Sequence, residues 1–265
     1  MKALKGIRVL VTRAQSQSSV FAQRLCKQGA DVSEVPLIKI VPPKSWRSLD
    51  LAIKNLERYD WVIFTSVNGA QFFAKRFAKL SKKKFPKIKT CAIGPSTASA
   101  LKKFNIPVTR RAEKYISESV LDLFKTVRGK NILIVRAKEA REILPQTLKK
   151  RGATVSIATA YQTLKNSSVK NNLNALLTQK IDCVTFTSAS TVRYFFNVLQ
   201  NKKMKQNIVA AAIGPITSAT LNQFGWTAEI VPAQSTIPAL SKAIVNFYKR
   251  LSKTSKTKGT RYEKK

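Results

Sequence analysis

The chain has 265 residues, and its 49 Lys or Arg against 13 Asp or Glu give a formal net charge of +36. It contains no histidine, which excludes histidine-based catalytic triads and histidine metal sites, and it has no apolar run near the roughly 18 residues of a membrane span. Its three cysteines fit no zinc or redox spacing and predict reduced core residues of a cytoplasmic protein: Cys26, Cys91 and Cys183.

Strand and helix patterns alternate along the whole chain. In the first half we expect strands near residues 7–12, 32–35, 61–65, 88–93 and 107–108. In the second half we expect them near residues 131–135, 154–158, 183–187, 208–213 and 228–231. Helical patterns fill the gaps, and strands such as 61–65 are almost purely apolar, as in parallel sheets covered on both faces. The pattern predicts two doubly wound α/β units.

The same motifs occur twice at nearly constant spacing. FTS at 64–66 returns at 186–188, AIGPST at 92–97 returns as AIGPIT at 212–217, and VTRA at 11–14 returns as VRA at 135–137. A repeat of this length is a whole domain rather than a solenoid unit. Ligand pockets favour domain interfaces, so the repeat predicts a site where two related lobes meet.

The repeated motifs sit where a strand ends and a helix begins, a position that favours anions. Each Ser or Thr taken alone is more often a helix cap than a ligand contact, and the recurrence of four such helix starts favours ligand binding. Arg13 and Arg136 end equivalent strands, and each either meets a substrate carboxylate or pairs with a nearby acidic residue. The candidate substrate-binding residues are Arg13, Thr65, Ser66, Gly94, Thr97, Ser119, Arg136, Thr187, Ser188, Gly214, Thr217 and Ser235.

The basic charge is concentrated in two stretches. Residues 75–89 and 249–265 each hold eight Lys or Arg, with no acidic residue in the first and one in the second. Residues 251–265 lack apolar periodicity and are predicted to be a disordered tail. Both stretches are read as solvated surface, as a field that attracts a polyanionic substrate, or as a nonspecific nucleic-acid contact; no motif for specific nucleic-acid recognition accompanies them.

From residue 7 to residue 248 the chain resembles the uroporphyrinogen-III synthase family. The resemblance rests on the VTR start, both FTS motifs, both GPxT turns and TAYQT at 159–163. It implies flavodoxin-like lobes that exchange chain halves: residues 1–37 with 164–250, and residues 40–160. Residues 36–41 and 158–164 would form a two-stranded connector.

The resemblance also implies a reaction, the cyclisation of hydroxymethylbilane to uroporphyrinogen III with inversion of ring D and loss of water. It implies no cofactor or metal, no membrane, a monomer, and substrate delivered by hydroxymethylbilane synthase. Tyr161 occupies the position of a family tyrosine that could protonate the departing hydroxyl, or it is a connector residue with a local hydrogen bond. Two other functions stay open: a non-enzymatic binding protein for small anions, and a basic protein associated with nucleic acid.

Overall fold

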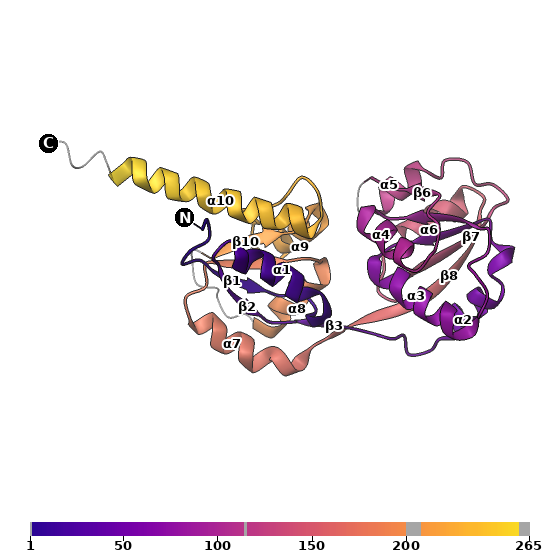
Figure 1. Ribbon diagram of the computed structural model, residues 1–265, viewed down its shortest axis with the longest axis horizontal. Coiled ribbons are helices and arrows are strands. Elements are labelled where there is room, and N and C mark those ends of the chain that lie inside the picture. The colour runs from indigo at the N-terminus through magenta and orange to yellow at the C-terminus, as the bar shows by residue number, and fades with distance from the viewer. Residues whose placement is uncertain (1, 114–115, 200–207, 260–265) are drawn as a thin grey trace. The chain divides into compact units, whose positions relative to one another are not determined.

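The computed structural model describes residues 2–113, 116–199 and 208–259, with side chains omitted for 15–19 and 253–259 (Figure 1). The chain forms two compact units. The first comprises Met1–Lys39 and Lys165–Lys265, and the second comprises Ile40–Leu164. No described helix has the length and hydropathy of a membrane span.

The first unit is a parallel sheet with the strand order β10-β9-β1-β2. Its strands are β1 (Arg8–Val11), β2 (Asp31–Glu34), β9 (Cys183–Phe186) and β10 (Val209–Ala212). Its helices are α1 (Gln15–Lys27), α7 (Lys170–Thr178), α8 (Ala189–Leu199), α9 (Pro215–Gln223) and α10 (Ile237–Gly259), with a 3-10 turn at Ser167–Val169.

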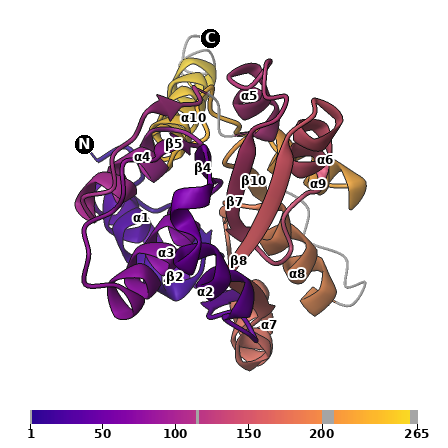
Figure 2. The same cartoon turned by 90° about the vertical axis from the view of Figure 1, so that its right-hand side faces the viewer.

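The second unit holds a six-stranded sheet with the order β3-β8-β7-β4-β5-β6. Its strands are β3 (Ile38–Val41), β4 (Trp61–Phe64), β5 (Lys89–Ala92), β6 (Arg110–Arg111), β7 (Asn131–Ala137) and β8 (Thr154–Lys165). Figure 2 shows β7 and β8 side by side, as their parallel register requires. The helices are α2 (Arg47–Lys54), α3 (Val67–Leu80), α4 (Pro95–Lys103), α5 (Ser117–Asp122) and α6 (Ile143–Lys150), with a 3-10 turn at Leu56–Arg58.

The two sheets have the same topology. By motif, β7, β8, β4 and β5 correspond to β1, β2, β9 and β10, so both units follow the flavodoxin order 2-1-3-4. β6 adds the fifth strand to the second unit, whereas the predicted strand 228–231 is reduced to one bridge between Ala211 and Ile230. The predicted fold class is therefore confirmed. Each unit takes the first half of its pattern from one repeat and the second half from the other.

Alternating strand residues build a core on each face of each sheet. In β4, Val62 and Phe64 pack with α2, α3 and α4, while Trp61 and Ile63 pack with α5 and α6. In β1, Leu10 faces α7, α8 and α9, while Val9 and Val11 face α1 and α10. Strands buried on both faces need apolar residues at every position, which explains the unbroken apolar runs in the sequence.

Several expected boundaries were wrong. The predicted strands 154–158 and 158–164 are one twelve-residue strand, β8. The predicted tail is helical as far as Gly259, because α10 continues beyond the buried Tyr248; residues 260–265 lie outside the described residues. Cys26 is exposed rather than part of a core, because it lies on the outer side of α1, whereas Cys91 and Cys183 are buried as expected.

Candidate functional site

The predicted site residues lie at the carboxyl edges of the two sheets. In a flavodoxin-like sheet, ligands bind where the strand order reverses, which here falls between β1 and β9 and between β7 and β4. Thr65 and Ser66 follow β4 directly, and Thr187 and Ser188 follow β9. The repeated FTS motif therefore marks the same topological position in each unit.

Tyr161 and Ser66 meet at this edge of the second unit. The Tyr161 hydroxyl donates a hydrogen bond to Ser66 Oγ at 3.1 Å, and the backbone N–H of Gly69 donates to the same oxygen at 2.9 Å. Ser66 is thus the N-cap of α3. Two accepted bonds use both lone pairs of Ser66 Oγ, so its own proton remains available for an anionic acceptor.

A β-bulge sets the direction of Tyr161. The register between β7 and β8 shifts at Arg136 and Ala137, so Ala137 pairs with Tyr161 and one residue of β8 is passed over. Bulges change the direction of side chains and often lie beside active sites. The Tyr161 ring then stacks on Phe72 at a centroid distance of 5.9 Å and an interplanar angle of 16°.

Tyr161 is 7 % exposed, and a tyrosine with the ordinary pKa of 10.0 is already protonated at physiological pH. Burial raises the pKa of Tyr161, while hydrogen bonds with Ser66 and Asn68 act in the opposite direction to a smaller extent. The phenol is therefore neutral at physiological pH. A neutral phenol at a ligand-binding edge can act as a proton donor.

The two arginines at strand ends differ in their surroundings. Arg136 is nearly buried, forms an ion pair with Glu142 and donates from Nη1 to the Arg141 carbonyl at 3.2 Å. Glu142 is thus the nearby acidic partner that one of the two interpretations of Arg136 expected. Arg136 Nε is buried with no hydrogen-bond partner among the described residues. Arg13 is half-buried, and burial lowers the pKa of Arg13 to about 10.

In the first unit, Ser188 caps α8. Its Oγ accepts from the N–H of Thr191 at 3.2 Å, and the Thr191 hydroxyl donates to the Ser188 carbonyl at 2.7 Å. Gly214 begins α9, and the Ser235 side chain packs against it: a Cβ on Gly214 would lie 2.1 Å from Ser235 Oγ. The structure therefore brings Gly214 and Ser235 together, and Gly214 accommodates a neighbouring side chain.

Some predicted residues are placed differently from expectation. Thr97 and Thr217 are the third residues of α4 and α9, and they are only 2 % and 4 % exposed. Ser119 is the third residue of α5, which begins at Ser117 rather than at Ser119. α10 begins at Ile237, and Thr236 rather than Ser235 supplies the capping oxygen, to Ala239 N at 3.2 Å. Thr65 Oγ1 donates to the Val135 carbonyl at 3.2 Å, so its proton serves the main chain.

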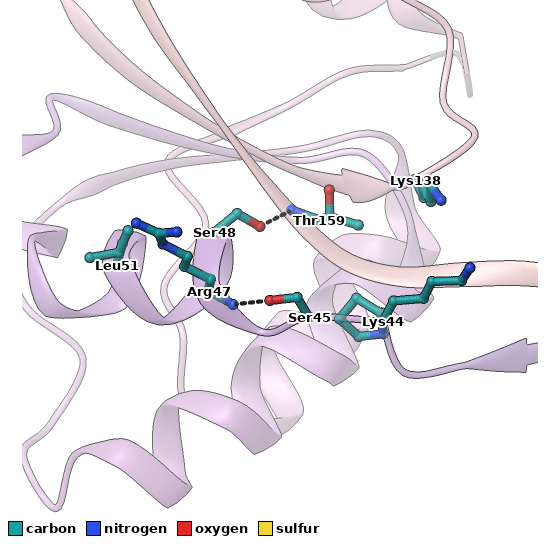
Figure 3. Close-up of a pocket in the computed structure, with 8 residues that line it drawn as sticks. Lys44, Ser45, Arg47, Ser48, Leu51, Lys138 and Thr159 are labelled. Carbon is teal, nitrogen blue, oxygen red and sulfur yellow. Dashed lines mark hydrogen bonds between the residues drawn. The ribbon is translucent and has the colours of Figure 1, made fainter.

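A basic pocket of about 460 Å³ adjoins this edge in the second unit (Figure 3). Lys44, Arg47 and Lys138 supply its cations; its other lining residues are Pro43, Ser45, Ser48, Leu51 and Thr159. Two hydrogen bonds hold its wall, from Thr159 N to Ser48 Oγ at 3.3 Å and from Arg47 N to Ser45 Oγ at 3.2 Å. Lys138 N also donates to the Tyr161 carbonyl at 2.9 Å, which ties the pocket to Tyr161.

Sequence reasoning did not find this pocket. Lys138 lies two residues beyond Arg136, but a single lysine in a chain this basic carries little signal. Positions 44 and 47 correspond in the second repeat to Asn166 and Val169, so the repeat comparison draws no attention to them. The proline pair before Lys44 was the one local sign of a fixed turn at this place.

Comparisons with known proteins agree with this topology. The family model described as uroporphyrinogen-III synthase HemD matches residues 19–242. The uroporphyrinogen-III synthase of Synechococcus elongatus is 32% identical over 253 residues, which cover 91% of this chain and 95% of the relative. That of Chlorobaculum parvum is 28% identical over 249 residues, covering 91% and 99%.

A crystal structure of a mutant uroporphyrinogen III synthase from the bacterium Thermus thermophilus shares the fold. Its TM-score is 0.68 at 20% sequence identity, with 94% of this chain and all of the other chain covered. The family model spans both repeats and nearly the whole described chain. The resemblance seen in the sequence is thereby confirmed, and the chain belongs to the uroporphyrinogen-III synthase family.

Proposed function

We propose that this protein cyclises the linear tetrapyrrole hydroxymethylbilane to uroporphyrinogen III, with inversion of ring D and loss of water. The observation that carries the proposal is the family match over residues 19–242, together with relatives of the same name that align over nearly their whole length. The position of the Tyr161 hydroxyl at the carboxyl edge of the second sheet supplies a proton donor for the reaction.

The substrate carries eight carboxylates, so binding must be largely a matter of anion recognition. Ser66 offers its remaining hydroxyl proton, and the starts of α3, α4, α8 and α9 offer backbone amides at the same edges. The pocket cations Lys44, Arg47 and Lys138 add charge beside Tyr161. These groups, with Arg13 and Arg136, are proposed to hold the substrate in one folded geometry. Holding reactive ends together is itself a large source of rate.

Tyr161 is proposed as the proton donor. The bond between the hydroxymethyl carbon and its oxygen breaks with the electron pair on oxygen, and the phenolic proton completes the leaving water. The resulting azafulvene is attacked by the substituted carbon of ring D, and fragmentation and reclosure follow. The ring proton lost at reclosure restores the phenol. The hydrogen bond from the Tyr161 hydroxyl to Ser66 Oγ places this donor at the carboxyl edge of the sheet.

The cellular setting is part of the same proposal. Hydroxymethylbilane closes spontaneously to the symmetric isomer I, so direct delivery by hydroxymethylbilane synthase would protect it. We further propose that the protein works as a cytoplasmic monomer. Analytical ultracentrifugation of the protein alone, and with that synthase, would test the monomer and the delivery complex separately.

The decisive experiment is incubation with freshly prepared hydroxymethylbilane and chromatographic separation of isomers I and III after oxidation. We expect isomer III to predominate without added metal, flavin or nucleotide. Heat-denatured protein at equal concentration is the control, because its charge is unchanged. A product mixture dominated by isomer I, as in buffer alone, would refute the proposal.

A further inference from the structure

A second pocket, of about 660 Å³, lies in the second unit away from Tyr161. It is formed where α3 and α4 end, whereas the N-cap of α3, Ser66, lies beside Tyr161 at the other end of the helix. The 14 residues of α3 place its two ends roughly 20 Å apart, at 1.5 Å per residue. The pocket is therefore at the opposite edge of the sheet from the candidate active site and has no part in the proposed reaction.

The pocket joins an apolar floor to a cationic rim. The floor consists of Ala74, Phe77, Ala78, Phe85, Phe104 and Ile106, and the rim contains three consecutive exposed lysines, Lys82, Lys83 and Lys84. The Phe85 ring packs against Phe73 and Phe77 at centroid distances of 6.3 and 5.8 Å, which fixes the loop that carries the lysines. No acidic residue occurs between positions 75 and 89.

The internal repeat shows what this pocket lacks. Phe104 at the end of α4 corresponds to Phe224 at the end of α9, and Ala74 in α3 corresponds to Phe196 in α8. In the first unit, Phe196 and Phe224 stack at a centroid distance of 4.5 Å and an interplanar angle of 3°. In the second unit, an alanine stands where that stacking ring would be attached.

The alanine leaves pocket space beside the ring of Phe104. Phe104 is 38% exposed, and no aromatic ring stacks on it within the described part of the chain. Ala74, which lines the pocket, leaves space of the kind that the Phe196 ring fills in the other unit. The repeat thus supplies an internal example of the group that fits: a flat ring parallel to the phenylalanine.

We propose that this pocket binds a small molecule that joins a planar aromatic ring to a carboxylate or phosphate. The ring stacks on Phe104 over Ala74, and the anionic group meets Lys82, Lys83 and Lys84. A pocket of this volume, with an apolar floor and three lysines in its lining, suits one small ligand. The site is independent of the tetrapyrrole reaction.

The test is a titration of the full-length protein with naphthoate, followed by calorimetry and by NMR of the backbone amides. Naphthyl methanol, which has the ring without the charge, and cyclohexane carboxylate, which has the charge without a flat ring, are the comparison ligands. We expect naphthoate to bind more tightly than either, and the largest amide shifts to fall on residues 81–85 and 104–106.

Two variants locate the site. Ala74→Phe restores the residue type of the other repeat and should weaken naphthoate about tenfold or more by filling the slot, as a loss of about 1.4 kcal/mol of binding would. A triple change of Lys82, Lys83 and Lys84 to Gln alters only exposed residues and should reduce the preference for naphthoate over naphthyl methanol by about threefold to tenfold. Neither should change the formation of isomer III.

A matched triple change of Lys125, Lys149 and Lys150 to Gln removes the same charge from the opposite face of the same sheet, where α5 and α6 pack. It should leave naphthoate binding unchanged. The proposal is overturned if naphthoate binds the Ala74→Phe protein and the pocket triple variant as it binds wild type, if the control triple weakens binding equally, or if the amide shifts fall elsewhere. Should Ala74→Phe not fold, the two lysine variants decide.

Discussion

The hydroxyl of Tyr161 joins two parts of the sequence that carried the first signs of function. It contacts Ser66, the last residue of the first FTS motif, from a strand that passes 95 positions later. Both readings of this tyrosine, proton donor and local hydrogen-bond partner, are consistent with that contact. A variant that lacks the phenolic hydroxyl but keeps the ring distinguishes the two roles.

Tyr161→Phe provides this separation. We expect turnover to fall about 10²- to 10⁴-fold, as for other general acids, while isomer III remains the product because geometry selects it. The ring contact with Phe72 is retained, so the free energy of unfolding should fall by only about 1 kcal/mol, the contribution of the lost hydrogen bond. Isomer-resolved turnover and urea unfolding measure the two effects.

Tyr248→Phe is the matched control. Its hydroxyl also donates a hydrogen bond, to the Asp182 carbonyl at 3.0 Å, but in the core of the first unit. The control should lose similar stability and keep its turnover. Equal turnover in the two variants would reduce Tyr161 to a packing residue, and release of isomer I by Tyr161→Phe would make it a positioning residue.

The basic pocket beside Tyr161 gives a second prediction at this scale. Changing Lys44 and Lys138 together to Gln should raise KM about threefold to tenfold and leave kcat nearly unchanged, because exposed cations assist binding more than chemistry. The difference from wild type should shrink as salt is added. The double change of Lys149 and Lys150 to Gln, exposed in the same unit, is the control. A fall in kcat at constant KM would contradict this role.

How far the sequence predicts the site depends on what each residue type reveals. Ser66 and Ser188 were predictable as N-caps because each follows a buried strand and ends the repeated FTS motif. Thr97 and Thr217 carry the same motif signal, but a helix has an inner and an outer face, and the motif does not say which one a third residue occupies. Lys138 belongs to a pocket made by segments distant in sequence, which no local pattern records.

At the scale of elements, the two GP turns are alike in sequence and different in cause. Gly94 has φ 86° and ψ 168°, a conformation essentially restricted to glycine. Gly214 has φ −177°, extended backbone open to any residue, and what it requires is space for Ser235. Glycine is therefore required at position 94 for its backbone conformation and at position 214 because it has no side chain.

Alanine at each position should reveal this difference. Gly94→Ala and Gly214→Ala are each expected to lower the free energy of unfolding by about 1–3 kcal/mol, through backbone strain and through overpacking respectively. Combining Gly214→Ala with Ser235→Gly removes the clash and should recover most of the loss. Urea unfolding of the single and double variants measures the coupling. Additive losses in the double variant would show that Ser235 is not the obstacle.

Helices and strands were predictable where the apolar periodicity of a segment and its length indicated the same type of element. The buried strand β4 was predicted correctly because four apolar residues in a row between polar turns admit few alternatives, and β9 was predicted from the repeat, although Thr185 interrupts its apolar run. The helix α10 was cut short because its last turns lack an apolar face, and propensity alone then decides whether a helix continues. The bulge in β8 left no sign at all, because one passed-over residue looks like ordinary alternation.

For the molecule as a whole, buried acids with raised pKa values predict a loss of stability in alkali. Burial raises the pKa of Cys91 from 9.0 to about 12 and also raises the pKa values of Cys183, Tyr161 and Tyr248. Above the ordinary value of 9.0 the unfolded chain therefore binds fewer protons than the folded one, so stability falls as pH rises. Arg13, with its lowered pKa of about 10, opposes this only at still higher pH.

The measurement is the free energy of unfolding from about pH 7 to about pH 10, which should be flat below about pH 8 and decline above it. Cys91→Ala removes one of the titrating groups and should make the decline shallower. Cys26→Ala, at an exposed thiol, is the control and should not alter the slope. Stability that rises between about pH 8 and about pH 10 would contradict the sign of the effect.

The exchange of halves between the repeats has a consequence for synthesis on the ribosome. β1 pairs with β9, and about 170 residues separate Val11 from Cys183. At the usual 5–20 residues per second, β1 waits roughly 10–35 s for its neighbour on that side. Meanwhile the whole of the second unit, Ile40–Leu164, has been made and can fold as one uninterrupted piece. Newly made chains thus expose the apolar residues of β1 for that interval, when chaperone capture or pairing with another nascent chain competes with correct assembly.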